Sequence, residues 1–510
     1  MGIDLRGAPL LVVGAGIMGA GIAQVAAQCG HPVRLFDVRD GAAADARRKL
    51  AATLDGLVAK GKLAADAAQA ALARIEPVAS LDAAADAKLV VEAIVEDLEA
   101  KRALFRQLEA LVAPDAVLAT NTSSISVTAI AGGLAHPGRV VGMHFFNPVP
   151  LMKLVEVVSG LQTDAAVADA VFKLAKLWGK VPVHATSTPG FIVNRIARPY
   201  YAETLALLHE RAATPQVLDA CLRVAGFRMG PCELMDLIGH DTNFAVTRSV
   251  YEANFYDKRY VPSLVQAEMV AGGLLGRKSG RGFYVYPDGA PALPVAAHEA
   301  PADLLKDTRE VVVHGDGPIA DALEAAATKA LAAQGWGPAR ERGSGWIGLA
   351  VDGARLMLTD GRTAAEVAAA TGIADVALFD RPLVLPAPSG AALAFSVADR
   401  ASAGWRAQAA AWLAALGFSP LPLADTPGLV VARTVAMLIN EAADAVLQGV
   451  CTPDGADAAM KLGVNYPAGP FEWLARWDVR GVVALIDALD ATYRGERYRV
   501  SPWLRRRALA

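Results

Sequence analysis

A histidine and a glutamate on two neighbouring apolar segments could together remove a proton from a substrate. His144 follows residues 139–143, a run that is apolar on both faces, as buried parallel strands are. Two prolines in residues 147–150 interrupt any strand, and the next apolar run carries one carboxylate, Glu156. A buried carboxylate needs a partner, and the turn can bring His144 alongside it. This pair predicts general-base catalysis; the alternative is a core histidine and a glutamate that faces solvent.

A glycine-rich turn near the start of the chain predicts a dinucleotide site. An apolar strand at residues 10–13 leads into the turn, which is followed by a helical run, a second strand at residues 33–36 and an acidic residue. This is the fingerprint of a βαβ unit that holds pyrophosphate at a helix N-terminus. An acid at that place accepts from ribose hydroxyls and repels a 2′-phosphate, which favours NAD over NADP. The predicted NAD-binding residues are Gly14, Ala15, Gly16, Ile17, Met18, Gly19 and Asp37.

Polar residues also follow two further predicted strands. Residues 88–96 read as a parallel strand with glutamates at its end, and residues 117–124 end in a cluster of small polar side chains. In an open α/β sheet, ligands lie beyond the carboxyl ends of the strands. We therefore expect Ser123, His144 and the glycine turn to share one crevice.

Residues 41–75 are predicted to be helical and carry several cations, among them Lys60. Two interpretations stay open. The segment is either a pair of solvated helices or an arm that binds the phosphates of a large anionic substrate.

Composition limits the class of protein. A chain of 510 residues needs two to four domains, and a net charge of −3 gives no signature of nucleic-acid or polybasic membrane binding. The 4 cysteines form no CxxC pair, no metal-ligand spacing occurs, and no secretory signal is evident, so we expect a cytoplasmic protein without a metal. Residues 8–33 lack charge, but their glycines and glutamines argue against a membrane span.

The second half of the chain contains an internal repeat of the first. Thr426-Pro-Gly-Leu-Val-Val-Ala-Arg433 repeats Thr188-Pro-Gly-Phe-Ile-Val-Asn-Arg195, and residues 469–473 repeat residues 230–234 at nearly the same offset. Residues 311–320 read as a degraded strand–glycine–helix start. The second copy has Ala432 in the place of Asn194, and no histidine follows His314. We therefore predict a catalytically inactive copy that packs on the first as a pseudo-dimer; a vestigial cofactor site near Gly315 is the alternative.

The predicted fold class is an α/β Rossmann-type NAD-binding domain, an all-α domain, and a diverged second copy of both. The Pro/Ala-rich stretch between the copies reads as a linker. The predicted boundaries are 1–186 for the Rossmann domain with its helical arm, 187–286 for the first helical domain, 287–307 for the linker, 308–424 for the degenerate Rossmann-like segment and 425–510 for the second helical domain.

The chain resembles the NAD-dependent L-3-hydroxyacyl-CoA dehydrogenases. The motifs that carry the resemblance are the glycine turn, residues 91–96, Asn121-Thr-Ser-Ser124, the segment from His144 to Glu156, residues 188–195 and residues 229–236. The resemblance covers residues 1 to about 286. It departs from the family at Arg228 and Cys232, where proline and phenylalanine are common, and these positions concern packing.

The resemblance implies a role for each matching residue. His144 is the base that takes the proton of the substrate 3-hydroxyl, and Glu156 is its partner. Ser123 and Asn194 match the contacts to the reacting oxygen and the acyl chain. Further cofactor contacts match Glu96, Lys101, Asn121, Ser123 and Asn147, and the coenzyme A contacts of the arm match Thr53 and Lys60.

The substrate within the class stays open. Two-copy members of the family resemble those of phenylacetate breakdown, which oxidise 3-hydroxyadipyl-CoA, while relatives oxidise 3-hydroxybutyryl-CoA. A free carboxylate on the acyl chain would need a cation, for which Arg195, Arg198 and Arg228 are candidates. The resemblance also implies a homo-oligomer, expected to be a dimer. The alternatives are a dehydrogenase of free β-hydroxy acids, which usually relies on a lysine, and a non-catalytic NAD-binding structural protein.

Overall fold

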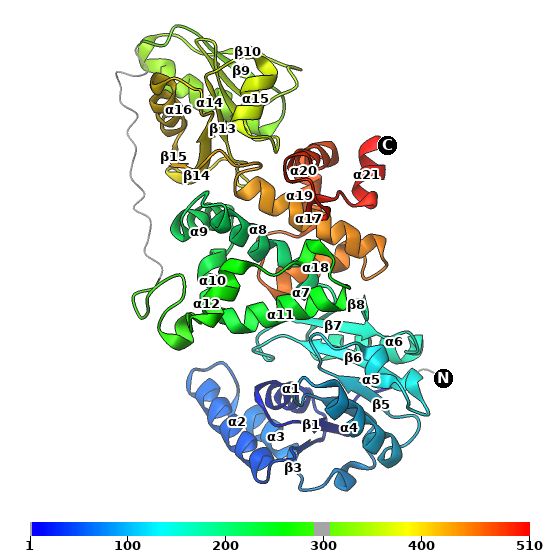
Figure 1. Cartoon of the computed structure of the whole chain (residues 1–510). Helices are drawn as coiled ribbons and strands as arrows, with labels where there is room; N and C mark the ends of the chain where they lie inside the picture. Colours follow the sequence, from blue (N-terminus) through cyan, green and yellow to red (C-terminus); the bar gives the residue numbers. More distant parts are fainter. Residues whose placement is uncertain (1–2, 290–306) are drawn as a thin grey trace. The chain divides into compact units, whose positions relative to one another are not determined.

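The chain forms two compact units in the computed structural model, which describes residues 3–289 and 307–510. The first unit consists of Met1–Arg195 and Ala445–Asn465, and the second of Ile196–Asp444 and Tyr466–Ala510 (Figure 1). Most of the predicted linker, residues 290–306, lies outside the described residues. The first unit therefore contains a segment from the second copy of the repeat.

An eight-stranded sheet forms the centre of the first unit, in the order β3-β2-β1-β4-β5-β6-β7-β8. All neighbouring strands are parallel except β6 and β7. The carboxyl ends of β1, β4, β5 and β6 therefore meet at one edge, as the Rossmann-type prediction requires. The strands are β1 Leu10–Val13, β2 Val33–Phe36, β3 Ile75–Pro77, β4 Leu89–Glu92, β5 Val117–Thr120, β6 Val140–Phe145, β7 Leu154–Ser159 and β8 Val181–Thr186.

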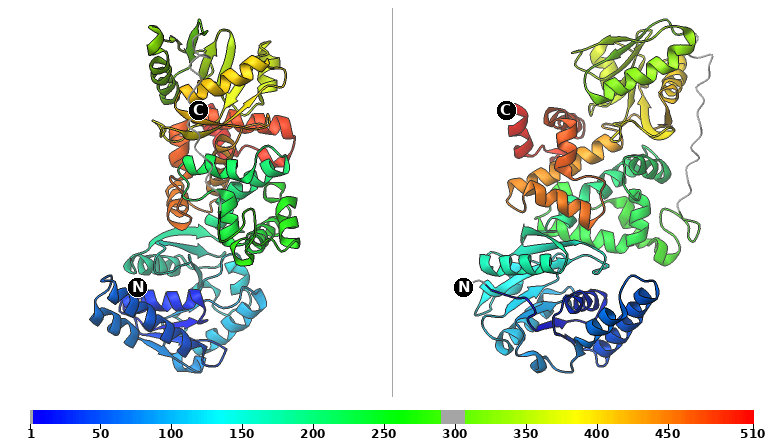
Figure 2. Two further views of the ribbon diagram at one scale, coloured as in Figure 1. Left: turned by 90° about the vertical axis from the view of Figure 1, so that its left-hand side faces the viewer. Right: turned by 180° about the vertical axis from the view of Figure 1, so that it is seen from behind.

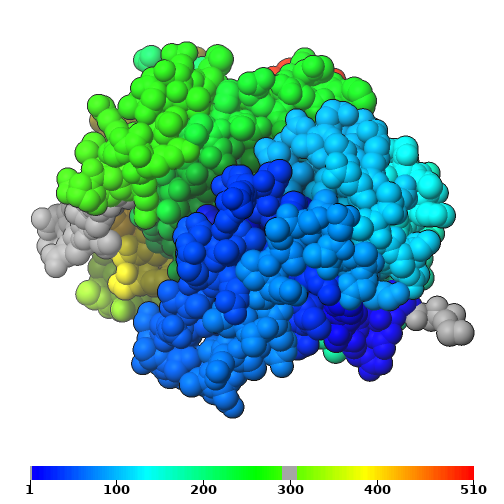
Figure 3. Space-filling view, turned by 90° about the horizontal axis from the view of Figure 1, so that it is seen from below, coloured from blue at the N-terminus to red at the C-terminus, as the bar shows by residue number. Residues whose placement is uncertain are grey.

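Helices connect these strands and cover the sheet. Strands β1, β4, β5 and β6 are buried along their whole length, which accounts for their continuous apolar runs. The predicted arm is formed by α2 and α3, seen in mid-blue in the view from below (Figure 3). The helices are α1 Ile17–Gln28, α2 Ala42–Ala59, α3 Ala65–Ala73, α4 Leu98–Leu111, α5 Val127–Ala131, α6 Ala165–Leu177 and α7 Val193–Ile196.

Some elements differ in length from the sequence-based expectation. The strand expected over residues 88–96 ends at Glu92, so Glu96 lies in the loop before α4. Strand β6 continues to Phe145, which places His144 inside the strand instead of after it. The apolar run after Pro189-Gly190 forms two helices, α7 and α8 (Arg198–His209), because Pro199 occupies the first turn of α8.

A segment of the second copy, residues 445–465, packs on strands β7 and β8 within the first unit. The backbone N–H of Thr186, at the end of β8, donates to the carbonyl of Val450 at 3.0 Å. Arg195 donates to the side-chain oxygen of Gln448 at 2.8 Å. Helix α18 (Pro453–Gly463) contacts β7 and β8, and a Cβ on Gly463 would lie 2.7 Å from the side chain of Leu154. The second copy therefore supports the strand that carries Glu156.

Helices of both copies form part of the second unit. None of the helices in the described ranges is long and apolar enough to cross a membrane. Helices α8 and α17 run side by side in all ribbon views (Figures 1 and 2). The first copy contributes α8, α9 Pro215–Val224, α10 Pro231–Ile238, α11 His240–Ala253 and α12 Leu264–Ala271; the second contributes α17 Val431–Leu447, α19 Pro470–Trp477, α20 Val479–Tyr493 and α21 Pro502–Leu509.

The second unit also holds a seven-stranded mixed sheet, in the order β10-β9-β11-β12-β13-β14-β15. This sheet is the diverged α/β segment expected from the repeat, and it has its own apolar core. Its strands are β9 Val311–His314, β10 Ala339–Glu341, β11 Gly348–Val351, β12 Ala354–Leu358, β13 Val376–Phe379, β14 Ala391–Val397 and β15 Phe418–Pro422. The helices around it are α14 Pro318–Leu331, α15 Ala364–Thr371 and α16 Ala403–Ala415.

Candidate active site

The antiparallel pairing of β6 with β7 places His144 directly opposite Glu156. The Nδ1 atom of His144 lies 2.5 Å from Oε2 of Glu156. His144 is 5% exposed and Glu156 is fully buried. The sequence-based pairing of these two residues therefore corresponds to a direct contact in the structure.

The second oxygen of Glu156 is held by the start of α7. Oε1 accepts the backbone N–H groups of Ile192 at 3.1 Å and Val193 at 2.9 Å. The imidazole ring itself lies between two aromatic rings, with centroid distances of 4.5 Å to Phe146 and 5.9 Å to Phe191. Because Nδ1 faces the carboxylate, Nε2 is the ring atom that can accept a proton from a bound molecule.

Three other predicted site residues lie beside this pair. The Nδ2 atom of Asn194, on α7, donates to the backbone carbonyl of Ser123 at 3.4 Å. Asn121 lies just after β5, and its Oδ1 accepts the backbone N–H of Phe145 at 2.9 Å. The ends of β5 and β6 and the start of α7 therefore bring Asn121, Ser123, His144, Glu156 and Asn194 into one region.

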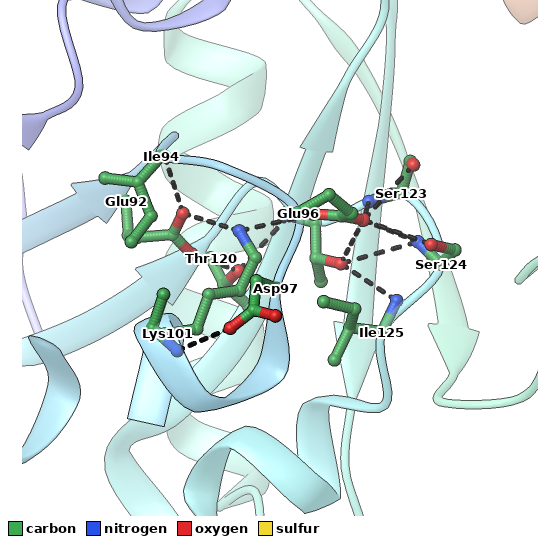
Figure 4. A network of polar contacts seen from close by, with 11 residues as sticks. Glu92, Ile94, Glu96, Asp97, Lys101, Thr120, Ser123, Ser124 and Ile125 are labelled. Atoms are coloured by element: carbon green, nitrogen blue, oxygen red, sulfur yellow. Dashed lines mark hydrogen bonds and ion pairs between the residues drawn. The ribbon is translucent and has the colours of Figure 1, made fainter. Parts of the chain in front are cut away.

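Glu96 fixes the loop that carries Ser123 (Figure 4). Its Oε1 accepts from the hydroxyl of Thr122 at 2.7 Å and from the backbone N–H of Ser123 at 2.9 Å. Its Oε2 lies 3.3 Å from the ammonium of Lys101. Burial raises the pKa of Glu96, but the charge of Lys101 and these hydrogen bonds outweigh it, so the pKa lies below its ordinary value.

Lys101 connects this loop to the sheet. Its Nζ donates to Oε1 of Glu92 at 2.6 Å, and both side chains are almost fully buried. The other oxygen of Glu92 accepts from the hydroxyl of Thr120 at 2.7 Å. Sequence reasoning singled out neither Glu92 nor Thr120 as a site residue. The signal that could have found Glu92 is an acid at the end of a buried strand with a lysine on the next helix.

The glycine turn has the shape that a dinucleotide requires. Gly14 has a φ of +103°, and a Cβ there would lie 2.4 Å from the carbonyl oxygen of Ala93. A Cβ on Gly19 would lie 1.7 Å from the carbonyl oxygen of Gly14. Gly16 is the N-cap of α1, and a Cβ there meets no atom within 4 Å. The space in front of the helix N-terminus is therefore open to a phosphate group.

Asp37 lies at the end of β2, where the fingerprint expects an acid. Its Oδ2 accepts the backbone N–H of Ala15 at 2.8 Å, and its Oδ1 accepts the backbone N–H of Arg39 at 3.0 Å. Partial burial raises the pKa of Asp37, but the hydrogen bonds from Arg39 and Ala15 lower it further, so it is ionised at neutral pH. The turn and this carboxylate together fit NAD.

The remaining predicted residues lie in different settings. Thr53 and Lys60 are exposed on the arm, and Asn147 is exposed after β6. Of the three candidate cations for an acyl carboxylate, Arg228 is exposed, whereas Arg195 and Arg198 are buried. Arg198 donates to the hydroxyl of Thr247 at 3.1 Å.

No group of three histidine, cysteine or acidic side chains that could hold a metal ion occurs within residues 3–289 and 307–510.

The second copy keeps part of the geometry of this site but has no histidine there. Ala394 on β14 pairs with Leu421 on β15, as Glu156 on β7 pairs with Val183 on β8. Asp380, just after β13, lies opposite Ala394 and donates its backbone N–H to the Ala394 carbonyl at 2.9 Å. Asp380 therefore holds the place of His144, and Ala394 the place of Glu156. The Asp380 carboxylate accepts the N–H groups of Val430, Val431 and Ala432 at 3.0, 2.7 and 2.9 Å. The main-chain clamp, in which a carboxylate accepts N–H groups at the start of the following helix, remains in the second copy, but the imidazole is absent.

Comparisons with protein families identify the class. Residues 10–188 match the 3-hydroxyacyl-CoA dehydrogenase NAD binding domain, and residues 190–286 and 428–510 each match the 3-hydroxyacyl-CoA dehydrogenase C-terminal domain. Residues 356–427 match the 3-hydroxybutyryl-CoA dehydrogenase reduced Rossmann-fold domain. The chain therefore belongs to the 3-hydroxyacyl-CoA dehydrogenase family. It is an oxidoreductase whose cofactor is NAD, and the internal repeat predicted from its sequence is confirmed.

Individual relatives resemble the whole chain or its first half. A 3-hydroxyadipyl-CoA dehydrogenase of Escherichia coli K12 is 43% identical over 98% of this chain and 97% of its own length. The crystal structure of a 3-hydroxybutyryl-CoA dehydrogenase from E. coli K12 has a TM-score of 0.87 at 42% identity and covers 99% of both chains. A probable 3-hydroxybutyryl-CoA dehydrogenase of Deinococcus radiodurans is 44% identical over 54% of this chain and 99% of its own length.

Proposed function

We propose that this protein oxidises (S)-3-hydroxyacyl-CoA to 3-oxoacyl-CoA, with NAD as electron acceptor and His144 as general base. The observation that carries the proposal is the buried contact between Nδ1 of His144 and the carboxylate of Glu156. NAD supplies the hydride acceptor when it is bound. The chain itself has to take the hydroxyl proton and hold the reacting carbon in place.

His144 takes the proton of the 3-hydroxyl on Nε2. This step makes the ring an imidazolium, whose charge the Glu156 carboxylate stabilises across the Nδ1 contact. Glu156 cannot turn away during the reaction, because Ile192 and Val193 hold its second oxygen. The same contact fixes the tautomer that presents Nε2 for proton transfer.

Asn194 and Ser123 orient the substrate in this proposal. Both carry hydrogen-bonding groups, and the contact of 3.4 Å between the Asn194 side chain and the Ser123 carbonyl keeps them adjacent. Ser123 is further held by Glu96 through its backbone N–H. A positioned oxygen accounts for a large share of the rate in such reactions, because it replaces a random encounter by a fixed geometry.

The names of the relatives support two substrates, 3-hydroxyadipyl-CoA and 3-hydroxybutyryl-CoA. We propose that the enzyme acts on one of them in the breakdown of phenylacetate or of short-chain acyl groups. The exposed Thr53 and Lys60 of the arm would then contact the coenzyme A moiety. Similarity over almost the whole chain does not choose between the two substrates, because the E. coli relatives that match it over this length carry both names.

The deciding experiment measures NADH formation by the purified protein with three substrates in parallel: 3-hydroxyadipyl-CoA, 3-hydroxybutyryl-CoA and free 3-hydroxybutyrate. We expect turnover of the thioesters and none of the free acid, and the ratio of kcat/KM between the two thioesters identifies the preferred acyl chain. Turnover of the free acid alone would assign the protein to the β-hydroxy acid dehydrogenases. Binding of NAD without turnover of any substrate would support the non-catalytic alternative.

The His144→Gln variant tests the assigned base. We expect kcat to fall ~10²- to 10⁴-fold, the usual contribution of a general base, while the Kd for NAD stays nearly unchanged. The matched control is His136→Gln, which replaces an exposed histidine outside the site and should leave kcat intact. A His144→Gln enzyme that keeps most of its activity would show that another group takes the proton.

A further inference from the structure

A cavity of about 530 Å³ lies in the second unit, at the edge of the seven-stranded sheet. Strands β9, β12 and β13 run in the same direction, because β11 is antiparallel to both β9 and β12 and β13 is parallel to β12. The cavity is lined by residues 316–319, which follow β9, and by residues 381–383 and Leu385, which follow β13. Ile347, side chains of α19 and Asp478 complete the lining. It therefore occupies the carboxyl edge of the sheet, where α/β proteins bind ligands.

Arg381 is a cation in this cavity without an anionic partner. Its Nε is fully buried and makes no hydrogen bond, and among residues 3–289 and 307–510 its guanidinium forms no ion pair. The neighbouring Asp380 directs its carboxylate to the main chain of Val430, Val431 and Ala432. Burial lowers the pKa of Arg381 to about 10, although the charge of Asp380 raises it in part. Arg381 as a whole is partly exposed, but its buried Nε has no hydrogen-bond partner, and such an unsatisfied group calls for a functional reason.

Apart from the exposed carboxylates Asp316 and Asp478, the other walls of the cavity are flat or apolar. The guanidinium of Arg381 stacks on Trp477, with 4.1 Å between the guanidinium carbon and the ring centroid. Trp473 is 4% exposed and lines the same space, together with the apolar side chains Ile319, Ile347 and Leu385. Arg476 adds a second cation that is exposed at the rim. These walls match a ligand that carries its charge on a planar or apolar body.

The same cavity does not fit a dinucleotide. His314 pairs with Glu341 as Val13 pairs with Phe36, so Arg342 holds the place of Asp37. The first turn of α14 contains Pro318, which lacks the N–H group that Ile17 offers at the start of α1. Asp316 adds a negative charge to the turn, where it accepts the backbone N–H of Gly343 at 2.8 Å. Pyrophosphate would therefore meet fewer donors and a carboxylate.

We propose that the second copy binds a small organic anion, a carboxylate or phosphate on a flat apolar body, with Arg381 as its anchor and Trp477 and Trp473 as its walls. The ligand's anionic group completes the hydrogen bonds of the Arg381 guanidinium, and its body covers the indole rings. The site is separate from the catalytic residues His144 and Glu156 and does not depend on the proposed reaction.

Isothermal titration calorimetry of the full-length protein tests this proposal with four probes: benzoate, phenyl phosphate, hexanoate and inorganic phosphate. We expect the two aromatic anions to bind more tightly than hexanoate and inorganic phosphate, because they cover the tryptophan walls. The ratio between benzoate and phenyl phosphate identifies the preferred anionic group. Affinities weaker than about 1 mM for both aromatic anions would overturn the proposal.

The Arg381→Met variant should lower the affinity for the preferred probe ~10- to 100-fold, the usual effect of losing a charge-assisted contact. It should also raise the Tm of the ligand-free protein, because a partly buried cation without an ion-pair partner among the described residues is removed. NADH formation should stay unchanged. The matched control is Arg505→Met, which removes an arginine paired with Asp487 at the surface and should alter neither the affinity nor NADH formation.

A second variant keeps the test decisive if Arg381→Met does not fold. Trp477→Phe retains the guanidinium but removes the indole on which it stacks, so the affinity should fall severalfold and the quenching of tryptophan emission by the probe should decrease. Equal affinity of the wild type and both variants would place the ligand elsewhere and overturn the assignment.

Discussion

At the scale of single residues, the two copies differ in the groups from which their buried carboxylates accept hydrogen bonds. Glu156 uses one oxygen for His144 and the other for the main chain of α7. In the second copy, Asp380 uses both oxygens for the main chain at the start of α17. The main-chain clamp is thus common to both copies, and the imidazole distinguishes the copy that we assign as catalytic from the other.

Replacing Asp37 should change the preference for the cofactor. In Asp37→Ser, the KM for NAD should rise ~10-fold, because a charge-assisted contact to the ribose is lost. The KM for NADP should fall, because Arg39 loses its carboxylate partner and can face a 2′-phosphate. Steady-state kinetics with both cofactors measures the change. Asp40→Ser, at an exposed neighbouring position, serves as the control, and an unaltered NAD to NADP ratio would contradict the assigned role.

Restoring an asparagine in the second copy should not restore activity there. Ala432→Asn supplies the counterpart of Asn194, but Asp380 and Ala394 still hold the places of the base and its partner. We expect the number of active sites per chain to stay at one when the enzyme is titrated in a single-turnover experiment. A second equivalent of NADH formed per chain would show that the copy is competent.

At the scale of elements, a buried ion pair joins the end of β4 to α4. Lys101 lies between Glu92, on the strand, and Glu96, in the loop before α4. Glu96 in turn accepts the backbone N–H of Ser123, in the loop after β5. Both Lys101 and Glu92 are shielded from water, so neither charge is compensated by solvent. The loop that positions Ser123 is therefore coupled to the stability of the sheet.

Lys101→Met should destabilise the protein by about 3–5 kcal/mol, because it leaves the buried Glu92 carboxylate without its cation. Lys88→Met is the matched control, because Lys88 pairs with Asp115 at the surface, at 3.1 Å. This substitution should change the stability by about 0–1 kcal/mol. Urea denaturation followed by circular dichroism measures both. Equal effects of the two substitutions would show that burial of the pair is unimportant.

At the scale of the whole molecule, buried charges join the two copies inside the second unit. Glu203, on α8 of the first copy, accepts from Arg433 of α17 at 2.6 Å and from Arg497 at 2.9 Å. Arg259 of the first copy forms ion pairs with Glu441 and Asp444 of the second. Within this unit, the helices of the repeat therefore pack on one another as the pseudo-dimer interpretation expected.

Glu203→Gln should destabilise the second unit by about 3–5 kcal/mol at neutral pH, since it removes the nearer carboxylate of the buried Arg433 and leaves only Glu210, at 3.6 Å. Burial raises the pKa of Glu203, but the charges of Arg497 and Arg433 outweigh it and lower the pKa. A lowered pKa gives stabilisation that is present above the ordinary value of a glutamate and is lost as the pH falls through the folded-state value. The difference in Tm between wild type and variant should therefore shrink below about pH 4.

Asp487→Asn provides the control for Glu203→Gln, because Asp487 forms an exposed ion pair with Arg505. It should change the stability by about 0–1 kcal/mol at any pH. A difference in Tm between wild type and Glu203→Gln that becomes larger as the pH falls would contradict the direction assigned to the pKa of Glu203.

The sequence alone determined the local part of this protein. The glycine turn, the acid after β2 and the apolar runs of β1, β4, β5 and β6 follow from backbone requirements and from burial on both faces, which leave a direct pattern in the residues. The proximity of His144 and Glu156 was also predictable, because they lie on adjacent strands joined by a short turn. The repeat was visible because the second copy preserves the Thr-Pro-Gly motif at residues 426–428.

The tertiary structure decided the contacts between residues that are distant in the sequence. Three such contacts depend on how the layers of the fold pack together, which no local sequence pattern records. They are the pairing of Lys101 with Glu92, the packing of α18 against β7 and the contact of Glu203 with Arg433. The replacement of His144 by Asp380 was equally hidden, because the strands of the second sheet have diverged and their alignment follows from hydrogen-bond register instead of from motif. Long-range packing determines strand register and charge pairing, and both can be assigned only when the arrangement of the sheets is known.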